Sequence, residues 1–79
     1  MKNYLIIRRI RYFIDGVPQS TTTYYHSHNT NYPIFTNNIE KANILQSKEE
    51  ANKIIHYINM HNESNIDIIE YIPNNEIEK

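Results

Sequence analysis

Alternation of apolar and polar residues predicts that the chain begins with a long β-strand. In residues 3–14 (NYLIIRRIRYFI), apolar side chains recur at period two on one face, interrupted only by Arg8. The other face is apolar at both ends and basic in the middle, where Arg9 and Arg11 lie. We expect the first face to be buried and the second to be largely solvated. The residues assigned to the buried face are Tyr4, Ile6, Ile10, Tyr12 and Ile14.

A second strand follows, because Asp15-Gly16 is a strong hairpin-turn signal and residues 20–28 (STTTYYHSH) are rich in Thr and Tyr. Residues 3–27 are therefore predicted to form a hairpin, with Pro18 in its loop or at the start of the second strand.

The middle of the chain predicts irregular structure. Residues 29–33 (NTNYP) are expected to form a loop, and Ile34-Phe35 a short apolar anchor. Thr36 can cap a helical turn over residues 37–43, with Ile39 and Ala42 facing inward. Ile44-Leu45 fits either a short strand or an inward plug.

A main helix is predicted over residues 48–61. Ser47 and Glu50 have the spacing of a capping box, in which each side chain bonds the backbone N–H of the other. The apolar positions recur at i, i+3, i+4 and i+7 and mark one buried face, formed by Ala51, Ile54, Ile55 and Ile58.

Residues 66–72 (IDIIEYI) predict a last strand, which Pro73 stops. The order of elements indicates an α+β fold, ββ-α-β, with an antiparallel sheet and one helix packed on one face. We expect residues 1–73 to form a single domain and residues 74–79 a flexible tail. No stretch is long enough to predict a membrane span or a signal peptide.

Charge is distributed unevenly along the 79 residues. Residues 1–39 carry Lys2, Arg8, Arg9 and Arg11 against Asp15, a net of +3, whereas residues 40–79 carry a net of −4. Such asymmetry marks either a binding face or only a solvated acidic helix and tail.

Candidate chemistry is sparse. The chain has no cysteine and one glycine, which excludes thiolate chemistry, a Gly-x-Ser-x-Gly elbow and a phosphate-cradling loop. We therefore expect no enzyme activity and no cofactor. His26 and His28 lie two apart in a strand and would share a side, but no third ligand has metal-site spacing. His56 and His61, at i and i+5, are expected on different faces of the helix, so no metal site is predicted.

The hairpin is the better candidate for a binding surface. Arginine and aromatic residues on an open sheet face suit protein interfaces and also single-stranded nucleic acid. The pI of about 6.4 favours a protein partner. A solvated face without any partner is the remaining alternative. The residues we expect to bind are Arg9, Arg11, Tyr24, Tyr25, His26 and His28.

Residues 35–51 (FTNNIEKANILQSKEEA), between the hairpin and the Ile-rich strand, resemble small single-domain proteins of bacteriophages and prophages in AT-rich hosts. The resemblance spans residues 3–72. It implies a cytoplasmic protein of the host cell that inhibits a host protein complex by occupying its surface, as anti-CRISPR proteins and other inhibitors of defence nucleases do.

The alternative function is a small nucleic-acid-binding regulator that uses the same sheet face. A metal-binding module through His26 and His28 is a third interpretation, which a rise in melting temperature with zinc would support. A homodimer through the Thr- and Tyr-rich edge of the hairpin is a further alternative, because an edge strand without blocking residues invites pairing.

Overall fold

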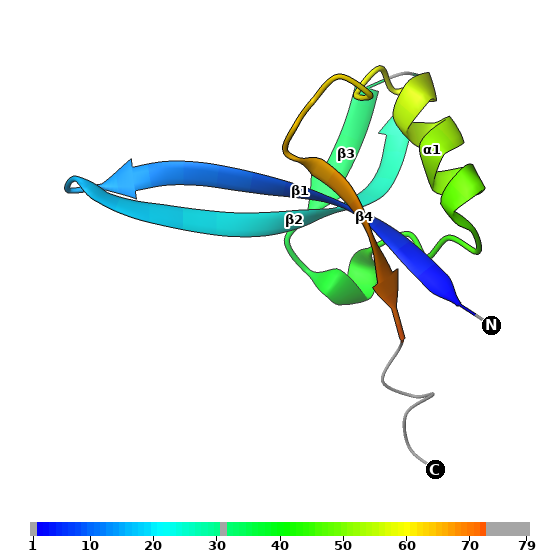
Figure 1. The fold of residues 1–79 in the computed structure, drawn as a ribbon, viewed down its shortest axis with the longest axis horizontal. Coiled ribbons are helices and arrows are strands. Elements are labelled where there is room, and N and C mark those ends of the chain that lie inside the picture. Colours follow the sequence, from blue (N-terminus) through cyan, green and yellow to red (C-terminus); the bar gives the residue numbers. More distant parts are fainter. Residues whose placement is uncertain (1, 31, 73–79) are drawn as a thin grey trace, which may run out of the picture.

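In the computed structural model, which describes residues 2–30 and 32–72, the chain folds into one antiparallel sheet and one α-helix (Figure 1). The strand order in the sheet is β3-β2-β1-β4. This confirms the α+β class and the hairpin, helix and final strand predicted from the sequence. The elements are β1 (Asn3–Ile14), β2 (Val17–Asn29), β3 (Tyr32–Thr36), the 3-10 helix η1 (Ile39–Lys41), α1 (Lys48–Tyr57) and β4 (Ile66–Tyr71).

The β1–β2 hairpin closes through a two-residue turn at Asp15 and Gly16. Both residues have positive φ, 52° and 79°, which matches the right-handed twist of the flanking strands. Ile14 pairs with Val17, so β2 begins three residues before the predicted start at Ser20. Pro18 is the second residue of β2, near the predicted place.

β3 is a strand that the sequence prediction missed, because residues 29–33 were assigned to a loop. Phe35 pairs with Tyr25, and Pro33 pairs with His28, on the outer side of β2. Proline is tolerated there because β3 is an edge strand and needs hydrogen bonds on one side only.

The core lies between the sheet and α1. Its buried residues come from β1, β2, the segment before the helix, the helix and the turn after it: Ile6, Tyr25, Leu45, Ala51, Ile55, Ile58 and Met60.

Whether a side chain of β1 is buried depends on how far along the strand it lies, not on which face of the sheet it points to. Leu5 and Ile7 on the second face are 0% and 3% exposed, although that face was expected to be largely solvated. Tyr12 and Ile14 on the first face are 41% and 53% exposed, although that face was expected to be buried. The first half of the strand is therefore covered on both faces and the second half on neither.

The pairing of β1 with β2 ends at Ile7 and Tyr24, after which the two strands diverge. Residues 43–45 lie between them there and form hydrogen bonds with both strands. Leu45 forms two backbone hydrogen bonds with Tyr4, of 2.8 and 2.9 Å, and the Asn43 amide donates to the Tyr25 carbonyl at 2.9 Å. The sequence allowed either a short strand or an inward plug at this point. Leu45 is both, because it forms a β-bridge with Tyr4 and its side chain is buried. Ile39, by contrast, is exposed rather than inward.

Polar side chains fix the starts of both helical segments. Asn38, rather than Thr36, caps η1 by accepting from the Glu40 amide. Ser47 caps α1 by accepting from the Glu50 amide at 3.0 Å, as predicted. The Glu50 carboxylate accepts from the Gln46 amide instead of that of Ser47, so the reciprocal half of the capping box is shifted by one residue.

The helix α1 ends four residues earlier than predicted. Asn59 takes a left-handed backbone conformation, with φ of 63°. Its amide donates to the His56 carbonyl and the Met60 amide donates to the Ile55 carbonyl, which together form a Schellman motif. Ile55 and Met60 are both buried, so the motif also closes one end of the core.

Within the described residues, no helix has the length and apolar character needed to span a membrane. The predicted flexible tail, residues 74–79, lies outside the described residues.

We expect Asn59→Ala to lower the free energy of unfolding by about 1 kcal/mol, because alanine is disfavoured at positive φ, and Asn59→Gly not to lower it. Asn62→Ala, at an exposed position with ordinary φ, is the matched control and should change stability by less than about 0.5 kcal/mol. Urea denaturation measures all three. Equal losses for Asn59→Ala and Asn59→Gly would show that the side chain, and not the backbone conformation, matters.

Candidate functional site

The main candidate site is the part of the hairpin that extends past the rest of the sheet. β4 pairs with β1 only from Asn3 to Arg8, and β3 pairs with β2 only from Tyr24 to Asn29. Residues 10–21 therefore form a two-stranded ribbon, called the arm below, which projects from the body and makes the molecule 44 Å long (Figure 1).

The end of the arm is apolar on both faces. Phe13 is 72% exposed, and Ile14 and Val17, which pair across the turn, are each 53% exposed. Four large exposed apolar side chains fall within residues 12–17, and such a concentration of exposed apolar residues is a feature of interaction sites.

Basic residues lie closer to the body on one face of the arm. Arg11 and Phe13 share this face with Arg9, which lies at the base of the arm, and all three are exposed. Their cross-strand neighbours are Thr22, Ser20 and Pro18, which are short and leave the arginine side chains uncovered.

Arg9 is held by an ion pair with Asp67 of β4, with 3.3 Å between Nη1 and Oδ2. The backbone N–H of Ile68, 2.8 Å from the other oxygen of Asp67, and the Arg9 side chain together lower the pKa of the Asp67 carboxyl. The carboxylate therefore keeps its charge in mild acid and stays paired with Arg9, in a contact where both side chains are about half exposed to water.

A cavity of about 450 Å³ lies at the base of the arm and is lined by Arg9, Arg11, Ser64 and Asn65. The first two bring positive charge and the last two belong to the turn before β4. This is a basic recess at the base of the arm, separate from the apolar tip at its other end, and it suits a ligand group that bears a carboxylate.

The other four residues predicted to bind differ in exposure and do not form one surface; they are Tyr24, Tyr25, His26 and His28. Tyr24 lies opposite Ile7, on the same face as Arg9, and is half-buried. Tyr25 is only 2% exposed, so the expectation that it is a surface residue is wrong. It packs edge-on against Phe35, and burial raises the pKa of its hydroxyl.

His26 and His28 are not brought together as a pair. A bulge between Tyr25 and Ser27 inserts one residue into β2 and interrupts the alternation on which the shared side was predicted. His28 is half-buried, where its Nδ1 shares a hydrogen bond with the Tyr25 hydroxyl and its ring contacts Tyr57. His26 is exposed, beside the Ser27 hydroxyl.

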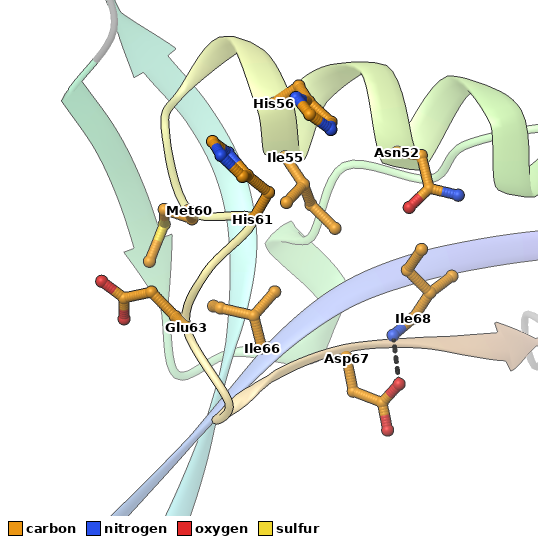
Figure 2. A pocket seen from close by; sticks show the side chains of 9 residues that line it. All are labelled: Asn52, Ile55, His56, Met60, His61, Glu63, Ile66, Asp67 and Ile68. Atoms are coloured by element: carbon orange, nitrogen blue, oxygen red, sulfur yellow. Dashed lines mark hydrogen bonds between the residues drawn. The ribbon is translucent and has the colours of Figure 1, made fainter.

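His56 and His61 stack on each other, with ring centroids 4.4 Å apart and planes within 6°. The prediction that they lie on different faces is wrong, because the helix ends before His61 and the following turn brings that ring back. Both line a pocket of about 380 Å³ between α1 and β4, shown in Figure 2. The carboxylates of Glu63 and Asp67 point away from the two rings. Residues 2–30 and 32–72 contain no cluster of three potential metal ligands.

Arg8 takes a different role from Arg9 and Arg11. Its guanidinium lies 4.2 Å from the centroid of the Phe35 ring, on the same side of the sheet as the core, in a cation–π contact. Its Nε is buried and has no hydrogen-bond partner within the part of the chain that the structure describes. Arg9 and Arg11 are therefore the two arginines of β1 that lie on its open face.

The sequence prediction missed the exposed tip residues as binding residues, although the sequence contained a signal for them; they are Tyr12, Phe13, Ile14 and Val17. A strand of twelve residues spans about 40 Å, whereas a helix of even fourteen residues covers about 21 Å. The hairpin therefore had to extend beyond the helix, whichever face was apolar.

No family model, curated protein or solved structure matches this chain.

We expect an NMR titration to place the pKa of Asp67 below its ordinary value of 3.8. In Arg9→Gln the pKa should rise but stay lowered, because the bond from the Ile68 amide remains. Stabilisation by the ionised carboxylate is present above the ordinary value and is lost as the pH falls through the lowered folded-state pKa. An unshifted pKa in the unmodified protein would contradict this account.

Proposed function

We propose that this protein is a non-catalytic binding protein that acts by inserting its arm into the surface of a protein complex. The observation that supports the proposal is the exposed apolar tip, in which Phe13, Ile14 and Val17 are each more than half exposed. Burial of these side chains in a partner would remove apolar surface from water at about 25 cal/mol per Å².

The composition of the arm also supports a protein partner. Interface cores are enriched in aromatic residues and arginine, and a few such residues carry most of the binding energy. On this proposal Phe13 is the apolar anchor, and Arg11 and Arg9 bind acidic groups of the partner around it. Because an isolated two-stranded ribbon is only marginally stable in water, contact with a partner would also order the arm.

Steric occupation is the mode of action that we propose. The resemblance to small phage proteins directs it to the host cytoplasm and to complexes such as CRISPR–Cas and other defence nucleases. A narrow ribbon can enter a groove that the complex uses for nucleic acid or for assembly, and the body of the protein would then block the groove.

Nucleic-acid binding is the second candidate, because Arg9, Arg11 and the exposed ring of Phe13 share one open face of the arm. Bases stack on such rings, and arginines neutralise phosphates. Two arginines on the open face and a pI of about 6.4 are low positive charge for a nucleic-acid-binding protein, which makes this candidate the weaker one.

We expect Phe13→Ser to abolish capture of the partner complex, because the main apolar anchor is lost. The matched control is Tyr32→Ser, which removes an aromatic side chain that is 74% exposed on β3, against 72% for Phe13. Affinity capture from bacterial lysate, with quantitative mass spectrometry, compares the two variants with the unmodified protein.

The proposal is supported if one complex is retained by the unmodified chain and by Tyr32→Ser but lost with Phe13→Ser. Equal retention by Phe13→Ser would contradict it. Melting curves of the variants should coincide, since neither side chain is in the core.

A salt titration distinguishes the second candidate. Two arginine–phosphate contacts on single-stranded DNA predict that log K falls with log salt at a slope of about −1.4. We expect no such binding, and fluorescence anisotropy with labelled oligonucleotides measures it. Binding with this slope, lost in Arg11→Gln, would replace the protein-partner proposal by the nucleic-acid one.

A further inference from the structure

The outer edge of β1 is open along the arm. The Arg9 amide donates to the Asn65 carbonyl at 2.9 Å, so the backbone groups of Arg9 point toward the β4 side. Backbone groups alternate along a strand, and those of Arg11 and Phe13 therefore point the same way. Among residues 2–30 and 32–72, no strand pairs with β1 there beyond Arg9.

We propose that this edge pairs antiparallel with the same edge of a second copy of the chain, with Tyr12 opposite Tyr12 on the twofold axis. This register places Arg11 opposite Phe13 and Ile10 opposite Ile14. It also brings Asp15 diagonal to Arg11 at the end of the ladder, since the Asn65 carbonyl already occupies the edge at Arg9. Each contact is favourable, because the first is a cation–π contact, the second is apolar and the third joins opposite charges.

Hydrogen-bond geometry restricts the choice of register. Arg11 and Phe13 present their N–H and C=O groups to the open edge, so these residues must oppose each other, or themselves, in the second copy. A shift that puts Arg11 opposite Arg11 brings like charges together, which is destabilising. A shift that puts Phe13 opposite Phe13 pairs only residues 11–15 and leaves Ile10 without its apolar partner.

The cavity at the base of the arm fits the tip of the second copy. In the proposed register the Asp15-Gly16 turn of one copy reaches the cavity of the other, which is about 450 Å³ in volume and lined by Arg9, Arg11, Ser64 and Asn65. Arg9 is already paired with Asp67, so Arg11 is the cation that Asp15 meets there. Asp15 is the only acidic residue among residues 1–39, and it lies at the point that meets this basic recess. Charge complementarity thus identifies a second copy as the occupant.

The other edge of the arm is less suited to pairing. The groups of β2 that point outward belong to the residues opposite Arg9, Arg11 and Phe13, which are Thr22, Ser20 and Pro18. Pro18 has no N–H to donate and interrupts a ladder at the tip, which is a recognised protection of edge strands. The two edges therefore differ, because the β1 edge of the arm keeps all its N–H and C=O groups and the β2 edge, rich in Thr and Tyr, lacks a donor at Pro18.

In the dimer the tip of each copy lies at the base of the arm of the other copy. The dimer and the insertion of the arm into a protein complex therefore use the same surface, and the monomer is the form that binds the complex. Cross-linking reports the dimer and affinity capture reports the binding of a complex, so each proposal can fail while the other holds.

Cysteine cross-linking tests the register, because the chain has no cysteine of its own. At a non-hydrogen-bonded pair the two Cα atoms lie about 4.5 Å apart, within the range of a disulfide. Tyr12→Cys should therefore form a covalent dimer about tenfold faster than Gln19→Cys, its cross-strand neighbour on the β2 edge. Arg11→Cys and Phe13→Cys should also be slower than Tyr12→Cys.

Faster cross-linking at position 19, 11 or 13 than at position 12 would overturn the proposed pairing. So would light scattering that gives the 9.5 kDa monomer throughout a concentration series. The expected result is a rise to twice that mass.

Proline variants test the backbone contribution. Phe13→Pro removes an N–H that points to the second copy and should leave a monomer, whereas Ser20→Pro removes one that points away and should leave a dimer. Phe13→Ser retains the backbone, so cross-linking through Tyr12→Cys should persist in that double variant even though capture of a protein complex is lost. A dimer in Phe13→Pro would overturn the inference.

Discussion

The length of the helix is the constraint on which the rest of this structure depends. A helix of ten residues spans about 15 Å and covers about five residues of a strand, whereas β1 has twelve residues and β2 has thirteen. The helix can therefore cover at most half of the hairpin, and the neighbouring strands β4 and β3 also stop at Arg8 and Tyr24, so the other half stays uncovered. Because the apolar residues continue to the turn, the uncovered half exposes Tyr12, Phe13, Ile14 and Val17, and the candidate site is a consequence of this mismatch.

The covered half is secured by several short segments rather than by a large core. At the start of β1, Leu45 forms backbone hydrogen bonds with the edge of the strand from which β2 has diverged. β4 pairs with the opposite edge. The Schellman motif at Asn59 turns the chain so that Met60 joins the core and β4 can follow. These contacts hold the base of the arm rigidly, which is required if a projecting ribbon is to bind with specificity.

Local signals in the sequence predicted much of the fold. The bounds of β1, the Asp15-Gly16 turn and the cap at Ser47 follow from alternation, turn chemistry and capping, which involve neighbours in the chain. β3 was missed because Pro33 and the asparagines around it favour a loop, and pairing with β2 overrides that preference. The end of α1 was misplaced because asparagine at a left-handed position carries a weaker signal than glycine.

The candidate site was predictable only in part, for a similar reason. Alternation correctly placed Arg9 and Arg11 on an exposed face. Alternation also assumes that a face is buried along its whole length, and so it could not distinguish Ile6 in the core from Ile14 at the tip. The burial of Tyr25 and the separation of His26 from His28 depend on one bulge in β2, which depends on tertiary pairing.

Local stability falls along β1 from its start to the turn, because the two ends of the strand differ in how many edges are hydrogen-bonded. Around Tyr4 the strand is bonded on both edges, so its amides can exchange with solvent only when the whole sheet opens. Beyond Arg9 it is bonded on one edge, and fraying from the turn can proceed without disturbing the helix. The protein thus contains a cooperative unit and an independently opening one within the same twelve residues, which allows the arm to adjust its shape while the body stays folded.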